Sequence, residues 1–209
     1  RRSGLVLVTG VGKSTLLDSL QGVVDGVHLA TAAPTDAPSL RAALKADPDM
    51  VVMDDVPDRE SARLLASAAK RGIFVLASAA DDIAQELSPD VSVACAVVAR
   101  LCAKQFHNTK KLSRAEGEVF ERYTSFAPIF NALKEEGVIP QGASWKDVVF
   151  AHPVPCGDCE GGYRGRVGIY EVADQGEVVG LTLAEDALFK AAEGLTSIEE
   201  ALGLVESLG

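Results

Sequence analysis

The chain has 209 residues, of which 47% are hydrophobic and 24% are charged, as is ordinary for a globular protein. The net charge of −10 argues against a general nucleic-acid-binding surface, and we expect no nucleic-acid partner. No apolar run approaches the roughly 18 residues of a membrane span, and no signal peptide is visible. The length accommodates one large domain, or one domain with a small appendage. Because the first residue is Arg1 and not Met, we expect the chain to be part of a longer protein.

The most informative stretch is residues 5–17, where an apolar run is followed by glycines, then by Lys13-Ser14-Thr15, then by leucines. This order predicts a strand, a phosphate-binding loop and a helix. Glycines let backbone N–H groups wrap a phosphate, and the N-terminus of the helix adds positive potential. Lys13 would reach the β- and γ-phosphates of ATP, and the Ser14 hydroxyl would hold Mg²⁺. The residues expected to contact the nucleotide are Gly10, Val11, Gly12, Lys13, Ser14 and Thr15.

The spacing of this motif is unusual. The phosphate-loop pattern has four residues between its glycines, whereas only Val11 separates Gly10 from Gly12. A loop this short does not surround a triphosphate in the usual way. Either three residues were lost during evolution or they are missing from this sequence. The alternative is a tight strand-to-helix turn with a chance Gly-Lys-Ser.

Strands and helices alternate over residues 5–77. We expect further strands at residues 27–31, 50–53 and 73–76, and helices at residues 14–21, 40–46 and 59–71. Ser39 and Asp58 are the expected N-caps of the second and third helices, and Gly72 is expected to end the third. Residues 50–53 are apolar without alternation, which suits a strand buried on both faces of a sheet. The alternation predicts an α/β fold with a parallel sheet.

The acidic pair Asp54-Asp55 follows the strand at residues 50–53. In a parallel sheet this pair would lie at the carboxyl edge, near the phosphate loop, where Mg²⁺ and an attacking water are managed. The simpler alternative is two turn aspartates at the end of a strand.

The second half of the chain is more varied. Residues 91–102 are apolar with small side chains and fit either a strand or a helix, whereas residues 113–136 predict helical segments that begin with a capping box, Ser113-x-x-Glu116. Residues 137–165 are rich in glycine and proline. Residues 196–208 predict an amphipathic helix, for which Thr196-x-x-Glu199 and Ser197-x-x-Glu200 are alternative capping boxes.

Four stretches, in this order, resemble the secretion ATPases that drive type IV pilus assembly and type II secretion. They are residues 4–15, which resemble the family's Walker A strand and loop; residues 40–49, which resemble L-R-x-x-L-R-x-D-P-D; residues 156–171, which resemble C-x-x-C…G-Y-x-G-R-x-G-I-x-E; and residues 194–200, which resemble G-L-T-[ST]-I-E-E. The third is the most specific. The resemblance implies an α/β fold of the P-loop NTPase (RecA-like) type, with a parallel sheet flanked by helices, a small zinc-binding, loop-rich insertion and C-terminal helices. We expect an ATPase core at residues 1–101, a metal-binding and helical subdomain at 102–171, and a C-terminal helical part at 172–209.

The chain also departs from the family pattern. The family has G-E-x-R-D after its Walker B strand, but here the sequence is Asp54-Asp55-Val56-Pro57-Asp58, so Asp55 replaces the glutamate. Aspartate is one methylene shorter and would orient an attacking water less well. The family's acidic pair before a proline falls on Ala32-Ala33, and its S-T-L-H box falls on residues 77–80, where the histidine is replaced by Ala80. Missing loop residues would explain the shorter spans but not these substitutions.

The cysteines predict a metal site. Cys156 and Cys159 form a Cys-x-x-Cys pair, which supplies half of a tetrahedral zinc site. In the reducing cytosol, where a phosphate-loop protein works, such a pair indicates a metal site or a redox pair rather than a structural disulfide. The resemblance implies a second pair after residue 101, but here Cys102 is followed by Gln105 at the matching position. We expect Zn²⁺ to bind Cys102, His107, Cys156 and Cys159, with His152 as the rival fourth ligand. The alternative is that the thiols are vestigial and bind no metal.

The resemblance implies the C-terminal ATPase domain of a motor that binds and hydrolyses ATP to drive pilin or pseudopilin assembly. Mg²⁺ would be held by Ser14 and, through water, by Asp55, and Lys13 would stabilise the transferred phosphoryl group, so Lys13 and Asp55 are the expected catalytic residues. The full-length protein would form a homo-hexamer in the cytoplasm, held at the inner face of the membrane by the platform protein of a pilus or secretion system. The alternative, motivated by the missing carboxylates and histidine, is a non-hydrolysing homologue that serves as a nucleotide-binding, assembly or regulatory subunit.

Overall fold

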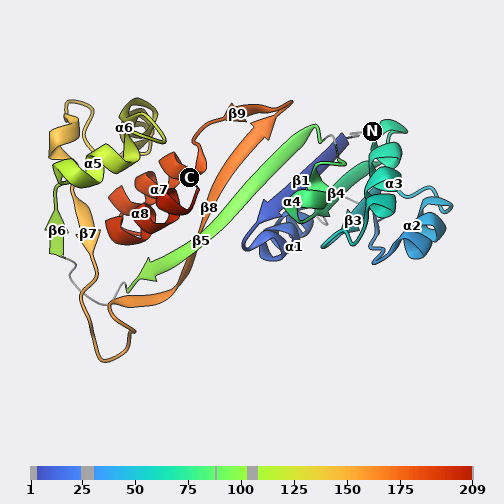
Figure 1. The fold of residues 1–209 in the computed structure, drawn as a ribbon, viewed down its shortest axis with the longest axis horizontal. Coiled ribbons are helices and arrows are strands. Elements are labelled where there is room, and N and C mark those ends of the chain that lie inside the picture. The colour runs from blue at the N-terminus through green and yellow to red at the C-terminus, as the bar shows by residue number, and fades with distance from the viewer. Residues whose placement is uncertain (1–3, 25–30, 88, 103–107, 209) are drawn as a thin grey trace. The chain divides into compact units, whose positions relative to one another are not determined.

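The computed structural model describes residues 4–24, 31–87, 89–102 and 108–208. The elements in chain order are β1 (Gly4–Gly10), α1 (Lys13–Val24), β2 (Thr31–Ala32), α2 (Ala37–Leu44), β3 (Met50–Met53), α3 (Arg59–Lys70), β4 (Phe74–Ser78), α4 (Asp81–Ala84), β5 (Val91–Leu101), β6 (Asn108–Lys110), α5 (Arg114–Phe120), α6 (Phe126–Glu135), the 3-10 helix η1 (Trp145–Asp147), β7 (Phe150–His152), β8 (Tyr163–Asp174), β9 (Glu177–Val179), α7 (Leu183–Ala192) and α8 (Ile198–Ser207). Figure 1 labels most of them. None of the helices in these ranges has the length and apolar character that a bilayer crossing requires.

The chain divides into two compact units. The first unit comprises residues 1–95 and 172–179, and the second comprises residues 96–171 and 180–209. In the described part of the chain, one sheet has the strand order β2-β3-β4-β1-β5-β8-β9, and β5 and β8 each contribute residues to both units. A separate antiparallel ribbon is formed by β6 and β7.

The first unit contains the predicted parallel sheet. Strand β1 pairs in parallel with β4 and β5, and β3 pairs in parallel with β2 and β4. The pair β8–β9 is antiparallel, which makes the complete sheet mixed. The α/β fold predicted from the sequence is therefore confirmed, and the sheet brings the carboxyl ends of β1, β3 and β4 to one edge (Figure 1).

Strand β3 explains why the first unit has two apolar layers. Its four residues are all buried. Val51 and Met53 belong to the core that includes Leu40 and Leu65, so helices α2 and α3 cover one face of the sheet. Met50 and Val52 pack with a second core, whose members come from α1, β1, β4 and β5: Leu17, Val8, Leu76, Val93 and Cys95. Burial on both faces accounts for the unbroken apolar run that the sequence showed.

The second unit is built on helices α5–α8 around a separate core. Its fully buried side chains include Phe120, Ile129, Leu133, Phe150 and Ile169. The ring of Trp145 stacks on that of Phe126, with 4.5 Å between the ring centroids. Phe120 on α5 and Ile129 and Leu133 on α6 thus join strand residues in one core.

Several local expectations change. Residues 91–102 form a strand, β5, over most of their length. The helix expected from Leu40 begins instead at Ala37, because the carboxylate of Asp36 accepts a hydrogen bond from the Ser39 N–H at 2.7 Å, which makes Asp36 and not Ser39 the N-cap. Asp58 caps α3 as predicted. At the C-terminal helix, Ser197 is the N-cap. The second strand was expected at residues 27–31, of which 27–30 lie outside the described residues; β2 consists of Thr31–Ala32.

Candidate nucleotide and metal sites

The turn between β1 and α1 contains only Val11 and Gly12. Gly10 and Gly12 both have a φ of +91°, which L side chains rarely adopt. A Cβ atom on Gly10 would lie 2.0 Å from the backbone oxygen of Cys95, on the neighbouring strand. Gly10 is therefore needed both for its backbone conformation and for the space it leaves. The sequence's short motif is a two-residue turn, with Val11 69% exposed at its tip.

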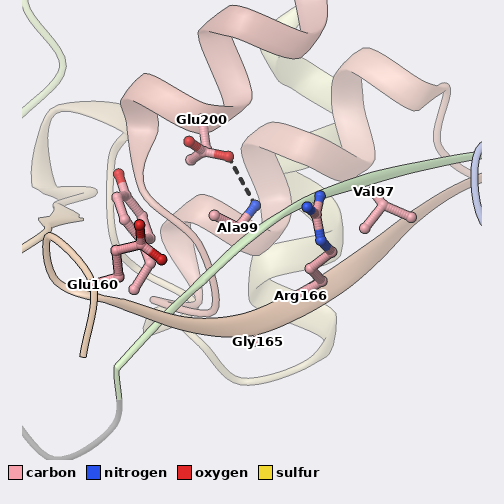
Figure 2. A pocket seen from close by; sticks show the side chains of 7 residues that line it. Val97, Ala99, Glu160, Gly165, Arg166 and Glu200 are labelled. Atoms are coloured by element: carbon pink, nitrogen blue, oxygen red, sulfur yellow. Dashed lines mark hydrogen bonds between the residues drawn. The ribbon is translucent and has the colours of Figure 1, made fainter. Parts of the chain in front are cut away.

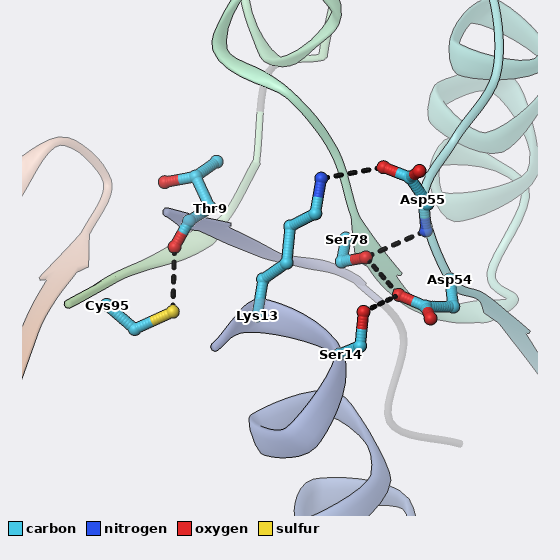
Figure 3. A network of polar contacts seen from close by, with 7 residues as sticks. All are labelled: Thr9, Lys13, Ser14, Asp54, Asp55, Ser78 and Cys95. Atoms are coloured by element: carbon cyan, nitrogen blue, oxygen red, sulfur yellow. Dashed lines mark hydrogen bonds and ion pairs between the residues drawn. The ribbon is translucent and has the colours of Figure 1, made fainter. Parts of the chain in front are cut away.

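Lys13 and Ser14 begin α1, and each contacts one of the two aspartates that follow β3 (Figure 3). The Nζ atom of Lys13 lies 2.6 Å from Oδ1 of Asp55. The hydroxyl of Ser14 donates to Oδ1 of Asp54 at 3.0 Å. The parallel sheet causes this meeting, because β1 and β3 end at the same edge. The predicted residues Lys13, Ser14 and Asp55 are thus brought together.

Two polar residues of this site were not among the predicted site residues, although Asp54 belongs to the acidic pair noted in the sequence. Asp54, rather than Asp55, contacts Ser14. Ser78, the last residue of β4, is fully buried and contacts both aspartates: its Oγ atom accepts from the Asp55 N–H at 2.8 Å and donates to Oδ1 of Asp54 at 2.5 Å. The signals for Ser78 in the sequence were its position at the end of an apolar strand and its place in residues 77–80, which align with the family's S-T-L-H box.

The residues present fit Mg²⁺ at Ser14 and Asp54. Ligands that occupy adjacent positions around Mg²⁺, each about 2.1 Å from the ion, lie about 3 Å apart. The Ser14 and Asp54 oxygens have this spacing, 3.0 Å. Asp55 is held by Lys13, with its side chain 71% exposed. The N-terminus of α1 and the Lys13 ammonium create a positive potential that favours an anion. The two-residue turn, however, contributes fewer N–H groups than a full phosphate loop.

Cys102, Cys156 and Cys159 converge in the second unit. Their sulfur atoms all lie within 4.8 Å of one another, and those of Cys102 and Cys156 are 3.9 Å apart. All are free thiols, and the 3.9 Å separation is far longer than a disulfide bond. Thiolates bound tetrahedrally to Zn²⁺ at about 2.3 Å would be separated by about 3.8 Å. The spacing and the soft donor set fit zinc.

Neither histidine completes this group in the described part of the chain. His107 lies outside the described residues. His152 is absent from the cysteine cluster, and its Nδ1 atom lies 2.5 Å from Oε1 of Glu199, so its ring has another partner. Cys95 belongs to the first unit, where its thiol contacts the backbone oxygen of Thr9 at 2.9 Å. Burial raises the pKa of the Cys95 thiol, which keeps it protonated at neutral pH.

A surface pocket in the second unit has a volume of about 530 Å³ (Figure 2). Its lining residues are Val97, Ala99, Glu160, Tyr163, Gly165, Arg166 and Glu200. Glu200, from α8, accepts a hydrogen bond from the Ala99 N–H at 2.8 Å, and the Tyr163 hydroxyl lies 2.8 Å from the Ser197 hydroxyl. These contacts join α8 to β5 and β8, which gives a structural function to two stretches that resemble family motifs, within residues 156–171 and 194–200.

The parallel sheet, the glycine turn followed by Lys13 and Ser14, and the aspartates after β3 together define the P-loop NTPase class of fold. A family model described as "Type II/IV secretion system protein" matches residues 27–200. The chain belongs to this family.

Curated relatives are similar over most of this chain. The type IV pilus assembly ATPase PilB of Pseudomonas aeruginosa is 28% identical, over 92% of this chain and 38% of its own length. The type II secretion system ATPase E of Vibrio cholerae is 24% identical, over 97% of this chain and 48% of its own length. The chain therefore spans less than half the length of these relatives. The PilB alignment extends over 229 residues, more than this whole chain contains, so the relative has segments that this chain lacks.

Two solved structures show the same fold. The pilus retraction motor PilT with bound ADP superposes with a TM-score of 0.56 at 15% identity, covering 97% of this chain and 61% of that one. The Legionella pneumophila ATPase DotB gives a TM-score of 0.54 at 13% identity, covering 100% of this chain and 61% of that one. At this level of identity the likeness concerns the fold alone.

Proposed function

We propose that this chain is the ATPase domain of a secretion or type IV pilus assembly motor, which binds Mg²⁺–ATP where α1 begins and hydrolyses it to drive pilin or pseudopilin assembly. The observation that carries the proposal is the convergence of Lys13 and Ser14 with Asp54 and Asp55 at one sheet edge. A cation, a hydroxyl and two carboxylates are the groups that phosphoryl transfer from a metal-bound nucleotide requires.

Each of these residues has a distinct role in the proposed reaction. Lys13 would leave Asp55 and stabilise the charge on the transferred phosphoryl group. Ser14 would hold Mg²⁺ together with Asp54, to which it is already bonded, and Asp55 could also approach the ion through water. The ion would neutralise charge on the phosphate oxygens when bound. Asp55, once free of Lys13, would orient the attacking water.

The wider assembly follows from the family and belongs to the proposal. The full-length protein would form a homo-hexamer with a nucleotide at each subunit interface, on the cytoplasmic face of the inner membrane, docked to the platform protein of a pilus or secretion system. Zinc at Cys102, Cys156 and Cys159 would fix the loop before β8 to the end of β5. It would act on folding and not on the chemistry.

A second function, a non-hydrolysing homologue, is favoured by two observations. The two-residue turn offers few N–H groups to a triphosphate. In addition, the two expected catalytic residues, Lys13 and Asp55, are paired with each other rather than directed at a nucleotide. Such a protein would bind nucleotide without turnover, or bind none, and would serve as an assembly or regulatory subunit.

Calorimetric titration with a non-hydrolysable ATP analogue and Mg²⁺, combined with a phosphate-release assay, separates these functions. For the motor we expect a Kd of about 1 μM, or about −8 kcal/mol, and measurable turnover. Lys13→Ala should weaken binding at least about tenfold, because a bound phosphate loses a charge-assisted hydrogen bond. Lys45→Ala, at an exposed lysine after α2, is the matched control and should change nothing.

The outcomes discriminate cleanly. Tight binding without turnover, unaffected by Asp55→Ala, would support the non-hydrolysing homologue. Millimolar or undetectable binding by the full-length protein would rule out the motor and leave a scaffold function. Loss of turnover in Asp55→Ala, with binding retained, would support the motor.

A further inference from the structure

We propose that Ser78 is a positioning residue that sets both carboxylates of the nucleotide site, and this inference rests on the function proposed above. Ser78 ends β4, and its side chain is completely buried. Its hydroxyl contacts the side-chain carboxylate of Asp54 and the backbone N–H of Asp55. No other single side chain in the described residues is hydrogen-bonded to both aspartates.

The direction of each hydrogen bond is fixed by donor chemistry. A serine hydroxyl has one proton to donate and two lone pairs that can accept. The Asp55 N–H can only donate, so Ser78 Oγ accepts from it at 2.8 Å. The single proton of Ser78 is therefore free to be donated to Oδ1 of Asp54, 2.5 Å away. The two bonds orient the hydroxyl between the aspartates, as Figure 3 shows.

The bond to Asp55 supports an uncommon backbone conformation. Asp55 has a φ of +51°, in the left-handed region that residues with a Cβ atom rarely adopt. Its N–H group is held by Ser78, and its side chain reaches Lys13 at 2.6 Å. Ser78 thus stabilises the backbone geometry from which Asp55 faces Lys13.

The bond to Asp54 matters when Ser14 changes partner. In this structure, Oδ1 of Asp54 accepts from the hydroxyls of both Ser14 and Ser78. When Ser14 Oγ turns to a cation that Asp54 also binds, the bond from Ser78 would be the one of these two hydrogen bonds that still orients this carboxylate. Partners of this kind, one step removed from the metal, orient the ligands and typically contribute ten- to a hundredfold to metal affinity.

The test measures the affinity for the ATP analogue with and without Mg²⁺, in wild-type protein and in Ser78→Ala. We expect the Mg²⁺-dependent gain in affinity to fall by about tenfold or more in Ser78→Ala, while the metal-free affinity stays the same. Ser78→Thr, which retains the hydroxyl, should preserve the gain. The Asp55 amide proton should also exchange with solvent faster in Ser78→Ala than in wild type.

Ser61→Ala is the matched control. Ser61, on α3 of the same unit, is equally buried, and in the described residues its hydroxyl is bonded to neither Asp54 nor Asp55. It should leave the Mg²⁺ dependence unchanged. If Ser78→Ala keeps the wild-type gain, the inference is wrong and the proposed function stands. If wild-type protein shows no Mg²⁺-dependent binding, the proposed function fails, and the role of Ser78 in it fails too.

Discussion

Replacing Cys156 by serine tests whether the three cysteines of the second unit hold zinc. The sulfur of Cys156 lies 3.9 Å from that of Cys102, and Cys159 completes a group within 4.8 Å. If free zinc is about 1,000 times its Kd, binding to the folded state alone adds about 4 kcal/mol of stability. For a unit of about 100 residues, each kcal/mol changes Tm by roughly 4–8 °C. We therefore expect Cys156→Ser or a chelator to lower the Tm of this unit by about 15–30 °C.

The assay combines elemental analysis with thermal unfolding before and after chelation. Wild-type protein should hold about one zinc per chain, and Cys156→Ser should hold much less. Cys95→Ser is the control, because Cys95 is buried in the other unit and contacts the Thr9 backbone oxygen. It should retain the metal. Less than roughly 0.2 zinc per chain in wild-type protein, or a Tm that does not respond to chelation, would refute the reasoning.

Two further predictions concern folding. Asp186→Ala should lower the free energy of unfolding, measured with urea, by about 3 kcal/mol. The reason is that the largely buried ammonium of Lys190, which lies 2.5 Å from the Asp186 carboxylate, loses its ion-pair partner. A change below about 1 kcal/mol would contradict this prediction. Gly10→Ala should prevent stable folding, since its methyl group would meet the Cys95 backbone oxygen. Gly22→Ala, on α1, is the control: its methyl group would point into open space, and the variant should be more stable than wild type by about 0.5–1 kcal/mol. Equal thermal stability of these two variants would show that the turn tolerates a side chain.

The sheet of the first unit was predictable because its signals are local. The apolar composition of residues 50–53 is enough to predict a strand buried on both faces, and Asp58 and Gly72 predict the two ends of α3. Residues 91–102 were ambiguous for a physical reason. Their small apolar side chains suit either a helix or a strand, and the choice falls to pairing, here with β1, whose residues lie more than 80 positions earlier.

The geometry of the candidate site was only partly predictable. The sequence predicted that Lys13, Ser14 and Asp55 would meet, because parallel strands end at one edge. Which aspartate contacts Ser14 depends on the backbone after β3, where Asp55 takes a positive φ. The contact between Ser78 and Asp54 joins residues 24 positions apart, one at the end of β4 and one just after β3, so it depends on these two strands lying side by side. No local pattern encodes it.

The stretch that most strongly indicated the family has a structural explanation that does not involve nucleotide. A Cβ atom on Gly162 would lie 2.6 Å from Pro153 and 2.8 Å from the Val154 backbone nitrogen, so this position needs glycine for packing, and one on Gly168 would lie 2.1 Å from the Tyr170 hydroxyl oxygen, so that ring would have to move. Glu171 accepts a hydrogen bond from the Leu183 N–H at 3.0 Å, which holds the start of α7. A hydrolysing motor and a non-hydrolysing homologue would need these contacts equally. The presence of this stretch is therefore explained by the fold of the second unit and does not distinguish the two functions. The measurements that do distinguish them are those on Lys13 and Asp55.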